Sequence, residues 1–109
     1  THNVTLFPYT TLFRSGCGLL INATNLGRGK LANISPLPDA WNCIPPRIVC
    51  IDSNYSPATT RLMEQVVAAG GVAFNGLDML VHQGARAFEL WTGMMPPVEV
   101  MRAAANARL

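Results

Sequence analysis

Three short apolar runs, each closed by polar residues, are the clearest pattern in this sequence. They are GLLINAT (residues 18–24), RIVCID (residues 47–52) and VAFN (residues 72–75). Continuous apolar runs of this length predict strands that are buried on both faces of a sheet. The stretch between the first two runs is rich in glycine and proline, so it predicts a long irregular connection with a helical turn at Pro38 to Trp41.

Helical spacing of apolar residues follows the second and third runs. The first helix is expected to begin with Ser56 as its N-cap and Pro57 at its first position, and to end at Gly70-Gly71. Its apolar face is formed by Leu62, Met63, Val66 and Ala69. A second helix is expected over about residues 77–91, with an apolar stripe of Leu77, Leu80, Val81, Gly84, Phe88 and Trp91. Pro96-Pro97 starts a last helix through Val98, Met101, Ala104 and Ala105.

The order of these elements defines the expected fold. Strands that alternate with helices indicate a parallel sheet with right-handed crossovers. We therefore predict an α/β fold, namely the C-terminal half of a Rossmann-like doubly wound parallel sheet, with three strands and flanking helices. The glycine-rich phosphate loop of the usual first half is not in this sequence, which suggests a fragment.

Composition narrows the functional classes. The 109 residues are 50% hydrophobic and 13% charged, with a net charge of +2 spread along the chain, so no basic stripe suggests nucleic acid. Three cysteines without a CxxC pair indicate free thiols of a cytosolic protein and no metal site. No apolar run is long enough to span a membrane.

The carboxyl ends of the strands are where chemistry is expected, because ligands of open parallel sheets bind there. Gly76 at the third strand end would let backbone approach a ligand closely. Met79 and Gln83 are four residues apart on the second helix and share a face that would suit a flat ring next to a polyol. From the pattern alone, the favoured alternative is that Met79 packs in the core and Gln83 faces solvent.

Other candidates are weaker. The GCG of residues 16–18 precedes a strand, whereas a dinucleotide-binding fingerprint follows one. The GRG of residues 27–29 is too short for a phosphate loop, and His82 points to a different helix face from Met79. Asp78 fits the first turn of the second helix, where a carboxylate favours the helix dipole.

Several motifs together resemble the C-terminal part of the shikimate dehydrogenase family. They are INAT-x-x-G (residues 21–27), D-x-x-Y-x-P (residues 52–57) with Thr60 following, NGLDMLVHQGARAFELWTG (residues 75–93) and PPVEVMRAA near the C-terminus. The resemblance covers about residues 16–109. It implies an NADP-dependent oxidoreductase that reduces 3-dehydroshikimate to shikimate in chorismate and aromatic amino acid biosynthesis.

The resemblance also implies roles for individual residues. Tyr55 and Gln83 would contact shikimate. Gly76 would hold the nicotinamide carboxamide through its backbone, and Met79 would pack on the nicotinamide ring. The remaining positions expected at the cofactor are Asn22, Ala23, Thr24 and Ser53. The partners implied are NADP and shikimate or 3-dehydroshikimate, with no nucleic acid, no membrane, a cytoplasmic location and a homodimer left open for the intact enzyme.

The sequence departs from the family pattern at several positions. Asn75 replaces the usual Asp, Asp78 stands where Gly is common, and Ser53-Asn54 is more polar than the usual apolar pair; Arg28 and Arg61 also differ. The family's catalytic lysine and its partner aspartate belong to a domain that this sequence does not include, so no catalytic residue is assigned. These departures leave open a quinate/shikimate dehydrogenase-like paralogue, or a binding module that lost its catalytic half.

The first fifteen residues have a different character. TLFPYTTLFRS (residues 5–15) resembles the in-frame translation of a common short-read sequencing adapter. We therefore expect residues 1–15 to be an artefact with no evolved domain. Residues 16–93 would be the C-terminal part of an NADP-binding Rossmann domain, and residues 94–109 a C-terminal helix.

Overall fold

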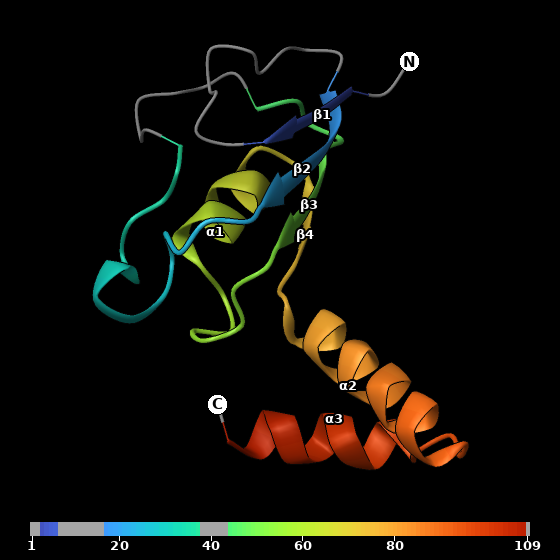
Figure 1. Ribbon diagram of the computed structural model, residues 1–109. Helices are drawn as coiled ribbons and strands as arrows, with labels where there is room; N and C mark the ends of the chain where they lie inside the picture. Colours follow the sequence, from blue (N-terminus) through green and yellow to red (C-terminus); the bar gives the residue numbers. More distant parts are fainter. Residues whose placement is uncertain (1–2, 7–16, 38–43, 109) are drawn as a thin grey trace.

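The computed structural model describes residues 3–6, 17–37 and 44–108. Four parallel strands form one sheet in the order β1-β2-β3-β4 (Figure 1). They are β1 (Asn3–Leu6), β2 (Cys17–Asn22), β3 (Val49–Asp52) and β4 (Val72–Phe74). The three predicted strands and their parallel arrangement are confirmed, with ends that differ by one or two residues, so the α/β prediction holds.

The fourth strand, β1, was not predicted. It pairs in parallel with β2, with Leu6 opposite Ile21, and lies next to the adapter-like stretch and partly within it. An open sheet edge offers unpaired backbone groups to any extended segment, so this pairing does not require an evolved sequence. The division of the chain at residues 15 and 93 stays a prediction. The helical turn expected at Pro38 to Trp41 lies outside the described residues.

The helices follow the predicted order. They are a short 3-10 helix, η2 (Gly29–Leu31), and the α-helices α1 (Arg61–Ala68), α2 (Leu77–Thr92) and α3 (Val98–Ala107). Within the described residues, no helix is long and apolar enough to cross a membrane.

The predicted start of α1 was wrong. Ser56 and Pro57 belong to the loop after β3, and the N-cap is Thr60, whose hydroxyl oxygen accepts from the backbone N–H of Met63 at 3.2 Å. The same hydroxyl donates to the Asp52 carboxylate at 2.7 Å. This second bond ties the helix start to the end of β3, and it explains why the helix begins four residues later than the Pro57 signal suggested.

The core lies between the sheet and α1. Its buried members are Leu20, Leu37, Ile48, Cys50, Leu62 and Val66. Burial, and to a smaller extent the nearby Asp52 carboxylate, raises the pKa of the Cys50 thiol to about 12, so this thiol stays protonated at neutral pH. A buried protonated thiol is unreactive, which agrees with the expected free cysteine.

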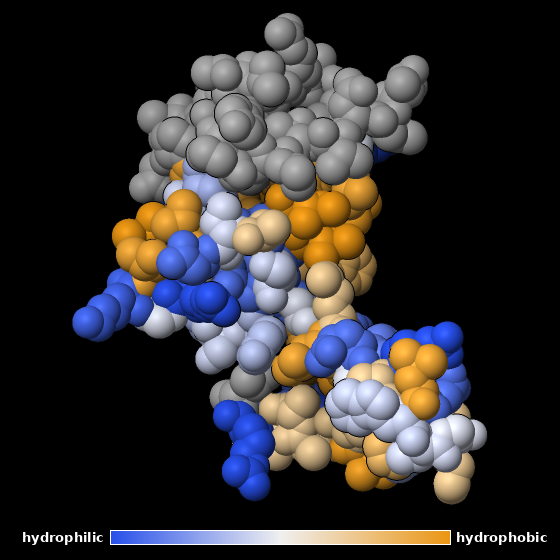
Figure 2. All heavy atoms as spheres, viewed as in Figure 1, coloured by the Kyte–Doolittle hydropathy of each residue, from blue (hydrophilic) through white to orange (hydrophobic). Residues whose placement is uncertain are grey.

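The face of the sheet opposite α1 is less covered than the face that packs on α1. Residues paired across it in register are all apolar: Leu19, Val49 and Val72 in one row, and Ile21, Ile51 and Phe74 in the next. Val72 is 53% exposed and Phe74 is 55% exposed. A continuous hydrophobic patch over the strands, on the side away from α1, is visible in Figure 2. The prediction that these strands are buried on both faces is therefore wrong for the described residues.

Helices α2 and α3 form a hairpin that extends from the end of β4 (Figure 1). They pack against each other, and neither packs on the described strands or on α1. The buried residues of α2 are Leu77, Val81 and Ala85, whereas Trp91 is 83% exposed. The predicted stripe therefore holds for Leu77, Val81 and Gly84, which faces Met101 of α3, and is wrong for Phe88 and Trp91, which α3 leaves exposed.

Candidate functional site

The carboxyl ends of β2, β3 and β4 lie at one edge of the sheet, where parallel α/β sheets bind ligands. Asn22 ends β2 and is paired in register with Asp52, which ends β3. Both side chains are fully buried. The polar side chains of Asn22 and Asp52 at the ends of these strands are therefore buried inside the protein.

The Asp52 carboxylate is the centre of a hydrogen-bonded network at this edge. One of its oxygens accepts from Asn22 Nδ2 at 3.2 Å, from the Asn54 backbone N–H at 2.9 Å and from Asn54 Nδ2 at 2.9 Å. Its other oxygen accepts from the Thr60 hydroxyl. A buried carboxylate is tolerable only when its oxygens are satisfied in this way.

The loop after β2 is shaped by Asn22 and Thr24. The Asn22 side-chain oxygen accepts from the Thr24 backbone N–H at 3.0 Å and from the Thr24 hydroxyl at 2.6 Å. Asn22 Nδ2 donates to the Leu26 carbonyl at 3.0 Å. Both polar atoms of the Asn22 side chain thus make hydrogen bonds that hold the loop. Beside it, Ala23 is exposed and Thr24 is half-buried.

Gly76 is held against the loop after β3. Its backbone N–H donates to the Asn54 carbonyl at 2.9 Å, and its own carbonyl accepts from Leu80 N at 3.0 Å. A Cβ at this position would lie 2.1 Å from the Ser53 carbonyl oxygen. Gly76 therefore allows a close approach to the Ser53 backbone, and the approach to a ligand that its position suggested stays a prediction.

Asn75, which replaces the usual family Asp, has a local role. Its side-chain N–H donates to the Ala58 carbonyl at 2.9 Å, and its side-chain oxygen accepts from the Leu77 backbone N–H at 3.0 Å. The first bond needs an amide donor, which a carboxylate does not have. Asn75 therefore ties the start of α2 to the β3–α1 loop. Asp78 lies in the first turn of α2, as expected, and pairs with Arg102 of α3.

Met79 and Gln83 are both exposed on α2. Met79 is 56% exposed, and Gln83 Nε2 donates to the Leu80 carbonyl of its own helix at 3.0 Å. Tyr55 and Ser53 are half-buried in the loop after β3. The alternative that Met79 packs in the core is wrong. Both side chains are accessible, and their roles stay a prediction.

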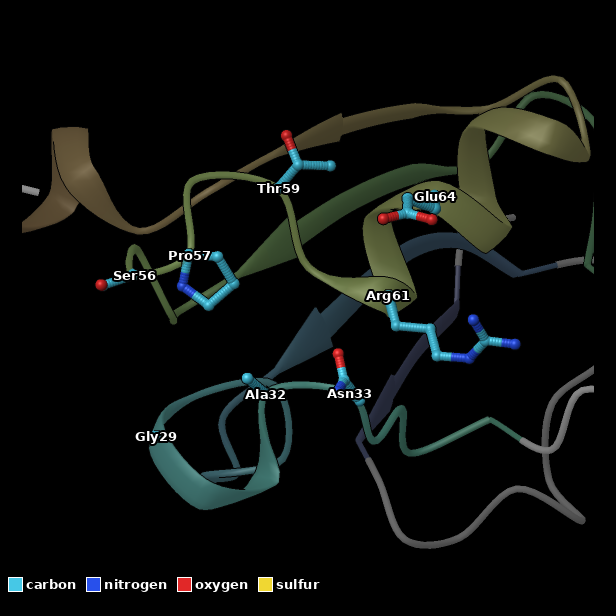
Figure 3. A pocket seen from close by; sticks show the side chains of 8 residues that line it. All are labelled: Gly29, Ala32, Asn33, Ser56, Pro57, Thr59, Arg61 and Glu64. Carbon is cyan, nitrogen blue, oxygen red and sulfur yellow. The ribbon is translucent and has the colours of Figure 1, made fainter.

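A cavity of about 560 Å³ lies beside the strand edge, between the η2 loop and the start of α1 (Figure 3). It is lined by Gly29, Ala32, Asn33, Ser56, Pro57, Thr59, Arg61 and Glu64. None of the eight positions assigned by resemblance lines it. Its walls come from the long irregular connection, the β3–α1 loop and the first turn of α1. The sequence pattern did not predict the folded paths of the two loops.

Sequence reasoning missed the part played by Asn54. This residue is 3% exposed, and its side chain reaches backbone carbonyls 28 and 30 residues earlier in the chain. The signal in the sequence was that Ser53-Asn54 is more polar than the family pair, but nothing local indicated which partners an amide would meet.

The comparisons with known proteins agree with this geometry. Residues 76–105 match a family model described as "Shikimate 5'-dehydrogenase C-terminal domain". The chain is 45% identical over 92 residues to a shikimate dehydrogenase (NADP(+)) of Symbiobacterium thermophilum, a match that covers 84% of this chain and 31% of that protein. The chain thus spans about a third of the length of the curated relatives it matches.

Solved structures also show similarity to part of dehydrogenases of this kind. A shikimate 5-dehydrogenase of Thermus thermophilus, solved with NADP(H) and shikimate, matches with a TM-score of 0.75 and 40% identity over 84% of this chain and 34% of that chain. A quinate dehydrogenase of Corynebacterium glutamicum, solved with NAD, matches with a TM-score of 0.74 and 27% identity over 87% of this chain and 32% of that chain.

The parallel sheet with flanking helices defines a fold class, namely the C-terminal half of a Rossmann-like doubly wound α/β fold. Within that class, the chain is similar to the part of the shikimate dehydrogenases that it matches, which is 31% of the Symbiobacterium protein and 34% of the Thermus chain.

Proposed function

We propose that this chain is the C-terminal part of an NADP-dependent shikimate dehydrogenase, which reduces 3-dehydroshikimate to shikimate. The observation that carries the proposal is the match at 45% identity to a shikimate dehydrogenase (NADP(+)) over 92 residues, which include all three strand-end segments. Since the chain spans about a third of such relatives, the activity belongs to the intact gene product and not to these residues alone.

The residues at the strand edge fit a nicotinamide cofactor. Met79 presents a soft apolar side chain to solvent on the first turns of α2, where a flat ring could pack on it. The Gly76 carbonyl accepts one intrahelical bond and has a second lone pair for a carboxamide N–H. When bound, NADPH supplies the hydride, and the protein orients the ring against the substrate.

In this proposal, the other positions form the walls of the site. Asn22, Ala23, Thr24 and Ser53 border the cofactor through the two loops that the Asp52 network holds together. Tyr55 and Gln83 contact hydroxyl or carboxylate groups of shikimate. The acid/base group is supplied from outside this chain, since the family places its lysine in another domain. We also propose a cytoplasmic enzyme that forms a homodimer when intact.

A second candidate is a quinate/shikimate dehydrogenase. The similarity in fold to a quinate dehydrogenase solved with NAD supports it, together with the polar Ser53-Asn54 pair. Rates with shikimate and quinate, each with NADP and NAD, separate the two candidates.

The proposal is tested with the intact gene product. We expect shikimate-dependent reduction of NADP, and we expect Gln83→Ala to raise KM for shikimate about threefold to tenfold, because one hydrogen bond to the substrate is lost. His82→Ala is the matched control, since His82 is also exposed on α2 but points to another face. Unchanged kinetics in Gln83→Ala would remove Gln83 from the site, and absence of any shikimate oxidation would remove the function.

The 109-residue chain alone should bind NADP poorly in calorimetry, because the helix N-terminus that holds a pyrophosphate is not among its motifs.

A further inference from the structure

Asn54 connects the three segments that follow β2, β3 and β4. Its side-chain Nδ2 donates to the Leu26 carbonyl at 3.0 Å and to the Thr24 carbonyl at 3.3 Å, both in the loop after β2. Its backbone carbonyl accepts from Gly76 N at 2.9 Å at the start of α2. Asn54 itself lies in the loop after β3, so one residue touches all three strand ends.

The side chain of Asn54 is anchored as well as buried. Its Nδ2 also donates to the Asp52 carboxylate at 2.9 Å, which sets the direction of the amide toward the loop after β2. Two amide hydrogens are shared among three acceptors, so the longest bond, to Thr24, is the weakest of the three. Only a side chain with N–H donors can make these contacts, and the apolar residue usual at this position in the family has none.

Loss of the Asn54 amide would affect the loop after β2 more than the rest of the molecule. The Leu26 carbonyl keeps its bond from Asn22 Nδ2, and the Asp52 carboxylate keeps its bonds from Asn22, Thr60 and the Asn54 backbone. The bond from Gly76 N is made to backbone and is also kept. The Thr24 carbonyl is the group that loses its side-chain donor.

We propose that Asn54 is a positioning residue that fixes the Thr24 segment against the Ser53–Tyr55 and Gly76 segments. On the proposed function, on which this inference rests, the amide sets the spacing between the residues that border the cofactor and those that contact the substrate. Asn54 touches neither ligand in this account, and it acts through the backbone of the loop after β2.

Hydrogen exchange of the 109-residue chain tests the geometric part without any ligand. Asn54→Leu keeps the shape of the side chain but removes its donors, and Asn25→Leu is the control on an exposed position of the same loop. We expect the amides of Leu26 and Gly27 to exchange about tenfold faster in Asn54→Leu, as for loss of one buried hydrogen bond. The amides of Gly71 and Gly76 should keep their rates, and Asn25→Leu should change none of the four. Equal acceleration at all four amides, or at none, would overturn the proposal.

Kinetics of the intact gene product test the role in positioning. Misplaced loops should lower kcat about tenfold in Asn54→Leu with little change in KM for shikimate, because alignment and not contact is lost. An unchanged kcat together with faster exchange of Leu26 would show a purely structural role and would overturn the proposal. If the wild-type protein does not oxidise shikimate, the proposed function fails, and the exchange pattern alone decides whether Asn54 fixes the segments.

Discussion

At the scale of single residues, Gly76 shows how a sequence position is restricted by its neighbours. Its φ is −82°, so its backbone conformation is open to any residue. The restriction is spatial, because a Cβ would lie 2.1 Å from the Ser53 oxygen and 2.6 Å from the Ser53 carbonyl carbon. Both atoms belong to the backbone and cannot rotate away, so an added methyl group must displace a loop.

Gly76→Ala should therefore destabilise the protein. We expect the free energy of unfolding to fall by about 1–3 kcal/mol, the usual range for forcing extra volume into a packed site. Gly84→Ala on the same helix is the control, since a Cβ there meets only Met101 Cε at 3.5 Å. Alanine inside a helix is favoured over glycine, so Gly84→Ala should raise stability by up to about 1 kcal/mol. Urea unfolding followed by circular dichroism measures both, and equal effects of the two substitutions would contradict this interpretation of Gly76.

The same scale shows which residues sequence reasoning could predict. A need for glycine at position 76 could be predicted, because glycine after a strand at a sheet edge is itself a signal, but the Ser53 backbone that imposes the need could not be. The role of Asn54 was not, because its side-chain partners Thr24 and Leu26 lie 30 and 28 residues away in sequence. Hydrogen bonds to distant backbone carbonyls depend on how loops fold, and no local pattern contains that information.

At the scale of elements, the start of α1 was predicted from the wrong signal. Proline is favoured at a first helical position, and Ser56-Pro57 offered that pattern. The N-cap is instead Thr60, since its hydroxyl caps the helix and also donates to Asp52. The C-terminal half of the apolar stripe of α2, at Phe88 and Trp91, was wrong for a related reason. Periodicity predicts a buried face but not its partner, and here α3 is that partner.

Thr60→Val tests this account of the helix start, since valine matches the shape of threonine but removes both hydrogen bonds. Loss of the N-cap costs about 0.5–2 kcal/mol, and the Asp52 oxygen left without its donor adds about 1–3 kcal/mol. We therefore expect the free energy of unfolding to fall by about 2–4 kcal/mol in thermal or urea denaturation. Thr59→Val is the control. Thr59 is exposed and should change stability by less than about 0.5 kcal/mol. A Thr60→Val variant as stable as Thr59→Val would show that neither bond matters.

At the scale of the whole molecule, the described chain has one sheet face covered by α1 and one that is apolar and open. The sequence predicted apolar strands correctly, because buried strands of parallel sheets carry no alternation. It could not predict that only one face would have a helix on it. That depends on whether the chain has a helix with a crossover on the second side, and α2 extends away from the sheet with α3.

The open face should bind a fluorescent apolar probe such as ANS in the native state, because exposed apolar side chains lie next to one another on it. Phe74→Thr should reduce that fluorescence, since Phe74 is 55% exposed in the second apolar row of the face. It should change the free energy of unfolding little, because threonine is also a good strand former. Val67→Thr is the control, as Val67 is 60% exposed on α1 and lies apart from the sheet face. Equal ANS fluorescence in both variants would show that the probe binds elsewhere, whereas a drop confined to Phe74→Thr identifies the uncovered sheet face as the exposed apolar surface.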